Sequence, residues 1–105
     1  MATFPGRRVA AVDGRLPPGY VTMPGLWLPG EYCGPLVGYT GNLPCVMYRL
    51  PNGRFGHDTS PPHTFRECAD GSLEIRNSIL HAAGGDDPDG VEWHGYLDEG
   101  NSWRT

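Results

Sequence analysis

The sequence predicts an all-β protein, a small antiparallel barrel or sandwich preceded by an irregular arm rich in proline and glycine. No window of roughly 11 residues or more places apolar side chains at the 3.6-residue period of a helix. Several short runs of β-branched and aromatic residues are instead bounded by Gly, Pro, Asn and Asp. With 105 residues, the chain forms one domain with a modest core and is too small for a deep active-site cleft.

Residues 1–44 are the predicted arm, and residues 45–105 are the predicted β domain. Residues 1–62 hold ten of the 11 prolines and ten of the 16 glycines, and Glu31 is the only charged residue between positions 17 and 44. Such a run cannot form a helix and is interrupted too often for long strands. A disordered linker would lack aromatic residues, whereas the arm carries Phe4, Tyr20, Trp27, Tyr32 and Tyr39. We therefore expect the arm to lie on a surface, either of its own domain or of a partner.

Two strands are expected in the first 50 residues. Residues 9–12 form a short strand that runs into an Asp13-Gly14 turn, and residues 45–50 form the clearest strand of this half. Pro51-Asn52-Gly53 then turns the chain back into residues 54–57, which gives a hairpin.

Two further hairpins are expected after residue 62. In the first, residues 63–67 pair with residues 72–76, and Leu73 and Ile75 face inward. In the second, residues 91–97 pair with residues 102–104, and Trp93 or Trp103 fills the core. Between these hairpins, residues 77–83 continue as a strand or make one helical turn, and residues 84–90 form an exposed acidic loop.

Charge and cysteine content limit the kinds of partner and the cellular compartment that we expect for the protein. The net charge is −4, and residues 63–105 carry three Arg against nine acidic residues, so a basic nucleic-acid interface is not expected. All eight basic residues are Arg, which indicates a GC-rich genome. Three cysteines leave one unpaired in any intrachain scheme, which favours a reducing compartment. No signal peptide or transmembrane segment is expected, so the protein is cytosolic when made.

No catalytic, cofactor-binding or metal-ligating residues are predicted. The histidines and cysteines lack the close pairs that are typical of zinc sites, and the acidic residues at 86, 87 and 89 lack the spacing of a calcium loop. A nucleophilic Cys68 with His63 or His81 is disfavoured, because Cys68 lies beside Glu67 and Asp70. Neither a G-x-S-x-G elbow nor a phosphate-binding glycine motif occurs. The histidines and cysteines considered for zinc are His57, His63, His81, His94, Cys33, Cys45 and Cys68.

The candidate partner-binding residues lie in the arm, around Trp27. This tryptophan is bracketed by Pro-Gly dipeptides, and an interface anchor is a frequent role for an exposed tryptophan. Covering the core of its own domain is an equally supported interpretation. The predicted partner-binding set is Trp27, Leu26, Leu28, Tyr20 and Tyr32.

Residues 62–79, together with residues 93–100 and Trp103, resemble small uncharacterised proteins of actinobacterial phages and their hosts. In that family a D-G-[ST]-L strand, an S-I pair and a W-H-G-[YF]-L…G…W ending recur, and this chain has Asp70-Gly71-Ser72-Leu73, Ser78-Ile79 and Trp93-His94-Gly95-Tyr96-Leu97. The resemblance covers roughly the last 43 residues and not the arm. Some members carry cysteine-pair metal ribbons, which this chain lacks.

The resemblance implies a phage setting and brings no activity with it. We therefore expect a non-enzymatic virion accessory protein without a cofactor, such as a capsid decoration or minor structural protein, attached through its arm and strand edges. Its partner would be a capsid or other virion protein, with self-association as a further option and with neither nucleic acid nor membrane involved. The protein would reside in the virion, and in the host cytoplasm before assembly. The alternatives are an early phage protein that captures a host protein or small ligand, and a small zinc protein or metal-dependent enzyme.

Overall fold

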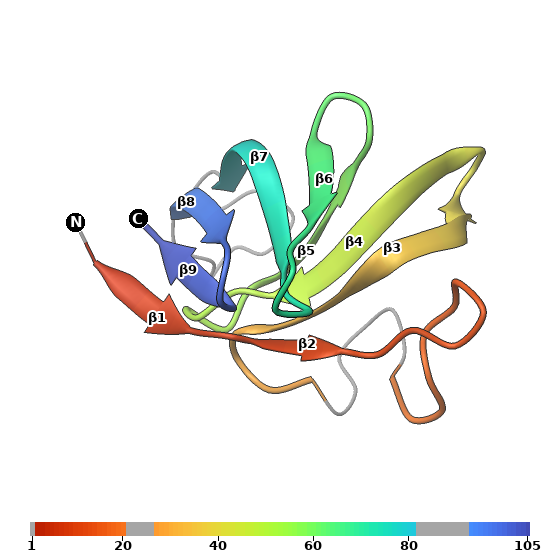
Figure 1. Cartoon of the computed structure of the whole chain (residues 1–105), viewed down its shortest axis with the longest axis horizontal. Helices are drawn as coiled ribbons and strands as arrows, with labels where there is room; N and C mark the ends of the chain where they lie inside the picture. Colours follow the sequence, from red (N-terminus) through yellow and green to blue (C-terminus); the bar gives the residue numbers. More distant parts are fainter. Residues whose placement is uncertain (1, 21–26, 82–92) are drawn as a thin grey trace.

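A computed structural model describes residues 2–20, 27–81 and 93–105, and these residues form nine strands in two sheets (Figure 1). The predicted all-β sandwich is confirmed, and the sheets do not close into a barrel. No helix long and apolar enough to cross a membrane occurs in the described part of the chain. The strands are β1 (Thr3–Pro5), β2 (Arg7–Val9), β3 (Glu31–Thr40), β4 (Leu43–Arg49), β5 (Phe55–Thr59), β6 (Thr64–Glu67), β7 (Leu73–His81), β8 (Trp93–Asp98) and β9 (Ser102–Arg104).

One sheet has five strands in the order β1-β9-β8-β7-β6, and the other has four in the order β2-β3-β4-β5. Every pair is antiparallel except β2 and β3, which run parallel. The three predicted hairpins are confirmed as β4–β5, β6–β7 and β8–β9. Gly53 has the expected positive φ of 92° in its turn, and residues 77–81 continue β7 rather than forming a helical turn. The loop expected at residues 84–90 lies outside the described residues.

The inner core lies between the two sheets and is centred on Trp103. Its indole ring packs edge-on against Tyr32, Tyr48 and Trp93, and its Nε1–H donates a hydrogen bond to the Gly30 carbonyl at 2.9 Å. Both candidate core tryptophans are therefore buried, as expected for one or the other. Along β4 the alternation of a strand sends Val46 and Tyr48 into this core and Cys45 to the opposite face. The full cluster is Tyr32, Val46, Tyr48, Leu50, Leu73, Ile75, Ile79, Trp93, Leu97 and Trp103.

A second apolar cluster covers the outer face of the four-stranded sheet. Val9, Trp27, Cys33, Leu36 and Cys45 are buried there, and partly buried side chains from residues 16 and 20 pack against them. Leu16, Tyr20 and Trp27, which precede β3, thus form a partial third layer. The described strands before residue 44 are members of the two sheets, and the expected boundary after residue 44 falls inside β4.

The expectation that residues 17–44 hold no long strand is wrong, because β3 is ten residues long. The β3–β4 register shifts twice, between Cys33 and Leu36 and between Leu36 and Thr40. These shifts accommodate the glycine and proline residues that would otherwise interrupt the strand. Gly34 and Gly38 have φ values of 151° and 83° at these irregularities. The strand accommodates its glycines by bulging and still pairs with strands on both sides.

The chain passes from the edge of one sheet to the edge of the other at Gly6. Pro5 ends β1 and Arg7 begins β2 (Figure 1). A Cβ atom on Gly6 would lie 2.8 Å from Trp103 Nε1 and 3.0 Å from the Gly30 carbonyl oxygen. Only glycine fits at this close approach, so residues 3–9 join both sheets along one side of the sandwich.

The three cysteines are free thiols, and all three are buried. Burial raises the pKa of Cys33 to about 11 and also raises the pKa of Cys45. We expect Ellman's reagent at pH 8 to label Cys33 and Cys45 only slowly in the folded protein, because thiolates are the reactive form. Denatured protein should release the full three equivalents at once. Rapid labelling of Cys33 in folded protein would contradict its placement in the outer cluster.

Candidate docking surface at the hairpin end

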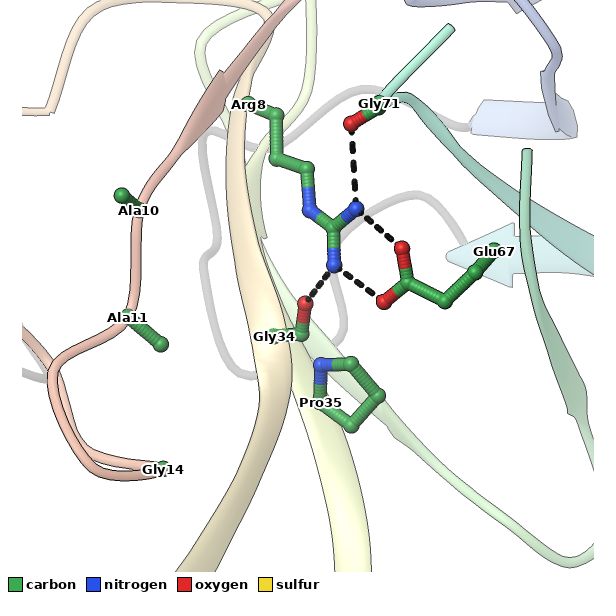
Figure 2. Close-up of a pocket in the computed structure, with 8 residues that line it drawn as sticks. All are labelled: Arg8, Ala10, Ala11, Gly14, Gly34, Pro35, Glu67 and Gly71. Carbon is green, nitrogen blue, oxygen red and sulfur yellow. Dashed lines mark hydrogen bonds and ion pairs between the residues drawn. The ribbon is translucent and has the colours of Figure 1, made fainter. Parts of the chain in front are cut away.

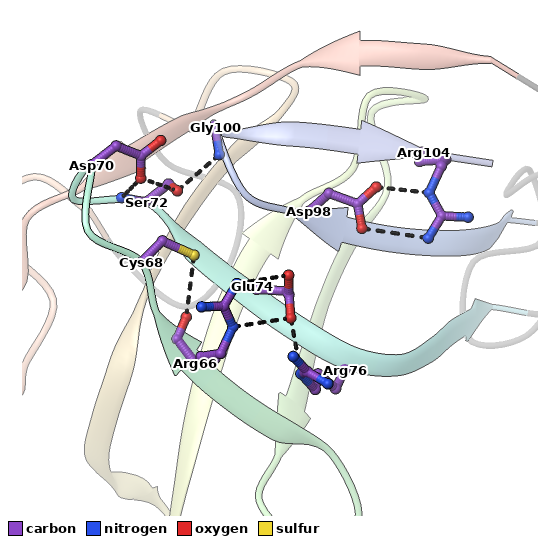
Figure 3. Close-up of polar contacts among 9 residues, drawn as sticks. All are labelled: Arg66, Cys68, Asp70, Ser72, Glu74, Arg76, Asp98, Gly100 and Arg104. Carbon is purple, nitrogen blue, oxygen red and sulfur yellow. Dashed lines mark hydrogen bonds and ion pairs between the residues drawn. The ribbon is translucent and has the colours of Figure 1, made fainter.

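The outer face of the five-stranded sheet is charged but internally paired (Figure 3). Glu74 accepts a hydrogen bond from Arg66 at 3.1 Å and forms an ion pair with Arg76 at 2.9 Å, and Asp98 pairs with Arg104 at 2.7 Å. Each of these charges has an opposite charge beside it. This face is therefore a solvated ion-pair ladder that offers little net attraction to a partner.

The tight turn that the Val12–Arg15 bridge closes lies against β3, whose far end turns into β4 (Figure 1), and both segments carry exposed aliphatic side chains. Val12 is 53% exposed, Val37 52% and Leu43 41%. The backbone N–H of Val37 donates to the Gly14 carbonyl at 2.9 Å, which holds the turn against the end of β3. We call Val12, Arg15, Val37, Tyr39 and Leu43 the hairpin-end surface.

Arg15 supplies a positive charge to this surface. Its guanidinium lies over the Tyr39 ring, 5.8 Å from the ring centroid, and Tyr39 in turn accepts a hydrogen bond from the Leu16 N–H at 2.9 Å. Among the described residues, no carboxylate oxygen lies within 4.0 Å of Arg15. The hairpin-end surface therefore combines aliphatic side chains, a tyrosine and a cation that the described part of the chain leaves without an ion pair.

An open groove of about 520 Å³ adjoins the hairpin-end surface at Gly14 (Figure 2). Its polar end is the Arg8–Glu67 ion pair, with two nitrogen to oxygen distances of 2.5 and 2.6 Å. Arg8 also donates to the Gly34 carbonyl at 2.7 Å and to the Gly71 carbonyl at 3.1 Å. Arg8 thereby ties β2 and β3 to the β6–β7 turn, and both of its terminal nitrogens are engaged. The groove is lined by Arg8, Ala10, Ala11, Gly14, Gly34, Pro35, Glu67 and Gly71.

A polar cluster links β4, β5 and β7 inside the sandwich. Tyr48 donates to Asp58 Oδ1 at 3.1 Å, and His63 Nε2 lies 3.9 Å from Asp58 Oδ2 and 3.3 Å from the Ser78 carbonyl. Burial raises the pKa of Tyr48 well above 10, and the neighbouring carboxylate of Asp58 adds to this effect. Sequence reasoning considered His63 for zinc but did not identify Asp58, which the β4–β5 pairing brings to Tyr48 and which the turn closed by the hydrogen bond from the His63 N–H to the Thr59 carbonyl brings to His63.

One group of potential metal ligands occurs among the described residues. Atoms of Cys68, Asp70 and Glu99 lie within 4.8 Å of one another at the β6–β7 and β8–β9 turns. Asp70 Oδ1 already accepts hydrogen bonds from the Ser72 N–H at 2.9 Å and the Ser72 hydroxyl at 2.5 Å (Figure 3). The Cys68 thiol donates to the Arg66 carbonyl, with sulfur and oxygen 3.7 Å apart. These contacts shape the turn, and the described histidine side chains do not belong to the group. The acidic residues at 86, 87 and 89 lie outside the described residues.

The predicted partner-binding residues do not form one exposed site. Trp27 is only 3% exposed and packs edge-on against Tyr20, with ring centroids 5.1 Å apart. Tyr32 is fully buried in the inner core, whereas Leu28 is 62% exposed; Leu26 lies outside the described residues. Of the two equally supported interpretations of Trp27, the structure shows the cover of its own domain and not an exposed anchor, because Trp27 packs on the apolar outer face of the four-stranded sheet.

Glu31 fixes this cover to the start of β3. Its carboxylate accepts hydrogen bonds from the Leu28 N–H at 2.7 Å, from Arg7 Nε at 2.9 Å and from the Tyr20 hydroxyl at 3.2 Å. Burial alone would raise the pKa of Glu31, but the Leu28 N–H, Arg7 and Tyr20 outweigh burial and lower the pKa below 4.5. The charged form of Glu31 is therefore the form that the fold stabilises.

We expect Glu31→Gln to lower the free energy of unfolding by about 1–3 kcal/mol at pH 7, because the donors around it lose a charged acceptor. The lowered pKa means that this stability is complete above about 4.5 and is lost as the pH falls through the folded-state value. Urea unfolding of both proteins at pH 7 and pH 3 measures the difference. The gap should shrink at pH 3, and a gap that widens in acid would contradict the role of the Glu31 charge.

No known protein family, functionally described protein or solved structure shows detectable similarity to this chain. The likeness to actinobacterial phage proteins accordingly remains a prediction from the motifs of residues 62–103. The site residues that sequence reasoning missed are Val12, Arg15, Val37, Tyr39 and Leu43, which come from two segments that meet only through the β3 ladder. The Gly41-Asn42 dipeptide between β3 and β4 is the local signal that could have located this hairpin.

Proposed function

We propose that this protein is a non-enzymatic binding module that attaches to another protein through the hairpin-end surface. We further propose that it serves as a phage virion accessory protein, either a capsid decoration or a minor structural protein. The virion setting rests on the sequence resemblance, and the attachment surface rests on the distribution of exposed side chains.

The observation that carries the proposal is the contrast between the faces of the sandwich. The outer face of the four-stranded sheet is covered by residues of the same chain, with Leu28 exposed beside Trp27, and the outer face of the five-stranded sheet is an ion-pair ladder, with Leu80 exposed on β7. The hairpin-end surface instead exposes Val12, Val37 and Leu43 around the stacked pair of Arg15 and Tyr39. Tyrosine and arginine, set among aliphatic side chains, are typical of the residues that dominate protein interfaces.

Purified virions of the phage whose genome carries this sequence test the setting. Quantitative mass spectrometry should find the protein at a copy number that matches the symmetry of a capsid or tail. Absence from virions, with capture of a defined host protein in infected cells, would overturn the virion assignment in favour of an early host-binding protein.

Two matched variants test the surface. Val37→Gln and Leu80→Gln each replace an exposed aliphatic side chain, 52% and 64% exposed, without changing the charge. Val37→Gln should lower virion incorporation at least tenfold, a change of about 1.4 kcal/mol in binding free energy, whereas Leu80→Gln on β7 should incorporate normally. Equal incorporation of the two variants would contradict docking through the hairpin end.

A further inference from the structure

We propose that the groove beside the hairpin-end surface binds an extended segment of the partner protein, with small apolar side chains in the groove and a carboxylate on Arg15. This inference rests on the proposed function, because it names the chemistry of the partner that the same surface takes.

The groove lies where the pairing between β2 and β3 stops, beyond Val9 and Cys33. The two strands pair from Arg7 opposite Glu31 to Val9 opposite Cys33. The next backbone contact between these segments is the hydrogen bond from Val37 to Gly14. Between these points the β2–β3 ladder has no further pair, and Ala10, Ala11, Gly34 and Pro35 line the groove (Figure 2).

The shape of the gap favours a polypeptide segment over a small molecule. Small-molecule sites usually bury about 70–90% of the ligand surface, and this groove is largely open to solvent. Away from Arg8 and Glu67, its lining consists of small residues of β3 and of the segment after β2, which allow another backbone to approach closely. Pro35 has no N–H to donate, so side-chain packing and Arg15, rather than a complete strand ladder, would hold the segment.

The charges of Arg8, Glu67 and Arg15 determine where an acidic residue of the bound segment would lie. At one end Glu67 already pairs with Arg8, whose terminal nitrogens also reach two backbone carbonyls, so a second carboxylate finds no attraction there. Arg15 does not itself line the groove but lies beyond Gly14, where it stacks on Tyr39 beside Gly38 and has no carboxylate within 4.0 Å among the described residues. Asp13 in the same turn is the nearest acidic residue in sequence and forms no ion pair with Arg15. An acidic residue of the partner therefore fits at the Arg15 end.

Selection from a displayed library of random twelve-residue peptides on the purified full chain tests the inference. Enriched peptides should combine small apolar residues with Asp or Glu. A synthetic copy of the best peptide should shift backbone amide NMR signals of residues 10–15 and 34–38. Its affinity should fall at least tenfold for Arg15→Gln and for Ala11→Leu, which fills the groove, and should stay unchanged for the control Arg76→Gln.

Three results would overturn the inference: no enrichment, enrichment of peptides without acidic residues, or equal binding to Arg15→Gln and the wild type. A protein that incorporates into virions but shows one of these results keeps the proposed function and loses the groove. A protein that is absent from virions but binds acidic peptides in the groove loses the virion assignment alone.

Discussion

Removal of residues 1–44 is expected to abolish folding of the rest of the chain. The deletion takes away β1, β2, β3 and the first two residues of β4, and with them one of the two partners of β4 and one of the two partners of β9. It also removes Tyr32 from the inner core and uncovers Cys45 on the outer face of the sheet. A domain with a few kcal/mol of net stability cannot lose this much buried surface.

Circular dichroism and urea unfolding of residues 45–105 provide the measurement. We expect no cooperative transition, whereas a control that lacks only residues 1 and 2, which precede β1, should unfold cooperatively. A truncated chain with a sharp transition would show that the first 44 residues form a separate arm after all.

Trp27→Ala is expected to lower the free energy of unfolding by about 3–5 kcal/mol, the usual cost of cutting a buried tryptophan to alanine. The ring is part of the layer that covers the outer face of the four-stranded sheet. It lies edge-on to Tyr20 and to Phe55, with ring centroids 5.1 and 6.4 Å apart. Its loss leaves a cavity on the outer face of the sheet. Chemical denaturation of the variant and the wild type measures the effect.

Leu28→Ala is the matched control, because Leu28 is the next residue and is 62% exposed. It should change stability by no more than about 0.5 kcal/mol. If Trp27→Ala left stability intact and instead removed binding to the virion partner, Trp27 would be an interface anchor and the outer cluster would be misplaced.

The sequence predicts the hairpins well because each depends on local chemistry. Turn residues such as Asn52-Gly53, flanked by short apolar runs, define β4–β5, and the alternation of Leu73 and Ile75 defines the buried face of β7. These features need no information about distant parts of the chain.

Local sequence does not predict the structure of residues 1–44. Gly34, Pro35 and Gly38 disfavour a strand by propensity, but β3 lies between β2 and β4 and bulges at these positions. The burial of Trp27 depends on the cover formed over the four-stranded sheet, a tertiary arrangement that no window of sequence reports. The hairpin-end surface was missed for the same reason, because the turn at residues 12–15 reaches Val37, through its hydrogen bond to Gly14, only after β2 and β3 pair in parallel.

Photo-cross-linking in assembled virions tests the central claim, that the hairpin-end surface contacts the partner. A photoreactive phenylalanine analogue replaces either Val37, at the hairpin end, or Arg76, on the ion-pair face of the five-stranded sheet. Illumination should join the protein with the analogue at position 37 to one virion protein and leave the protein with the analogue at position 76 unlinked. Cross-linking from position 76 without cross-linking from position 37 would contradict the account.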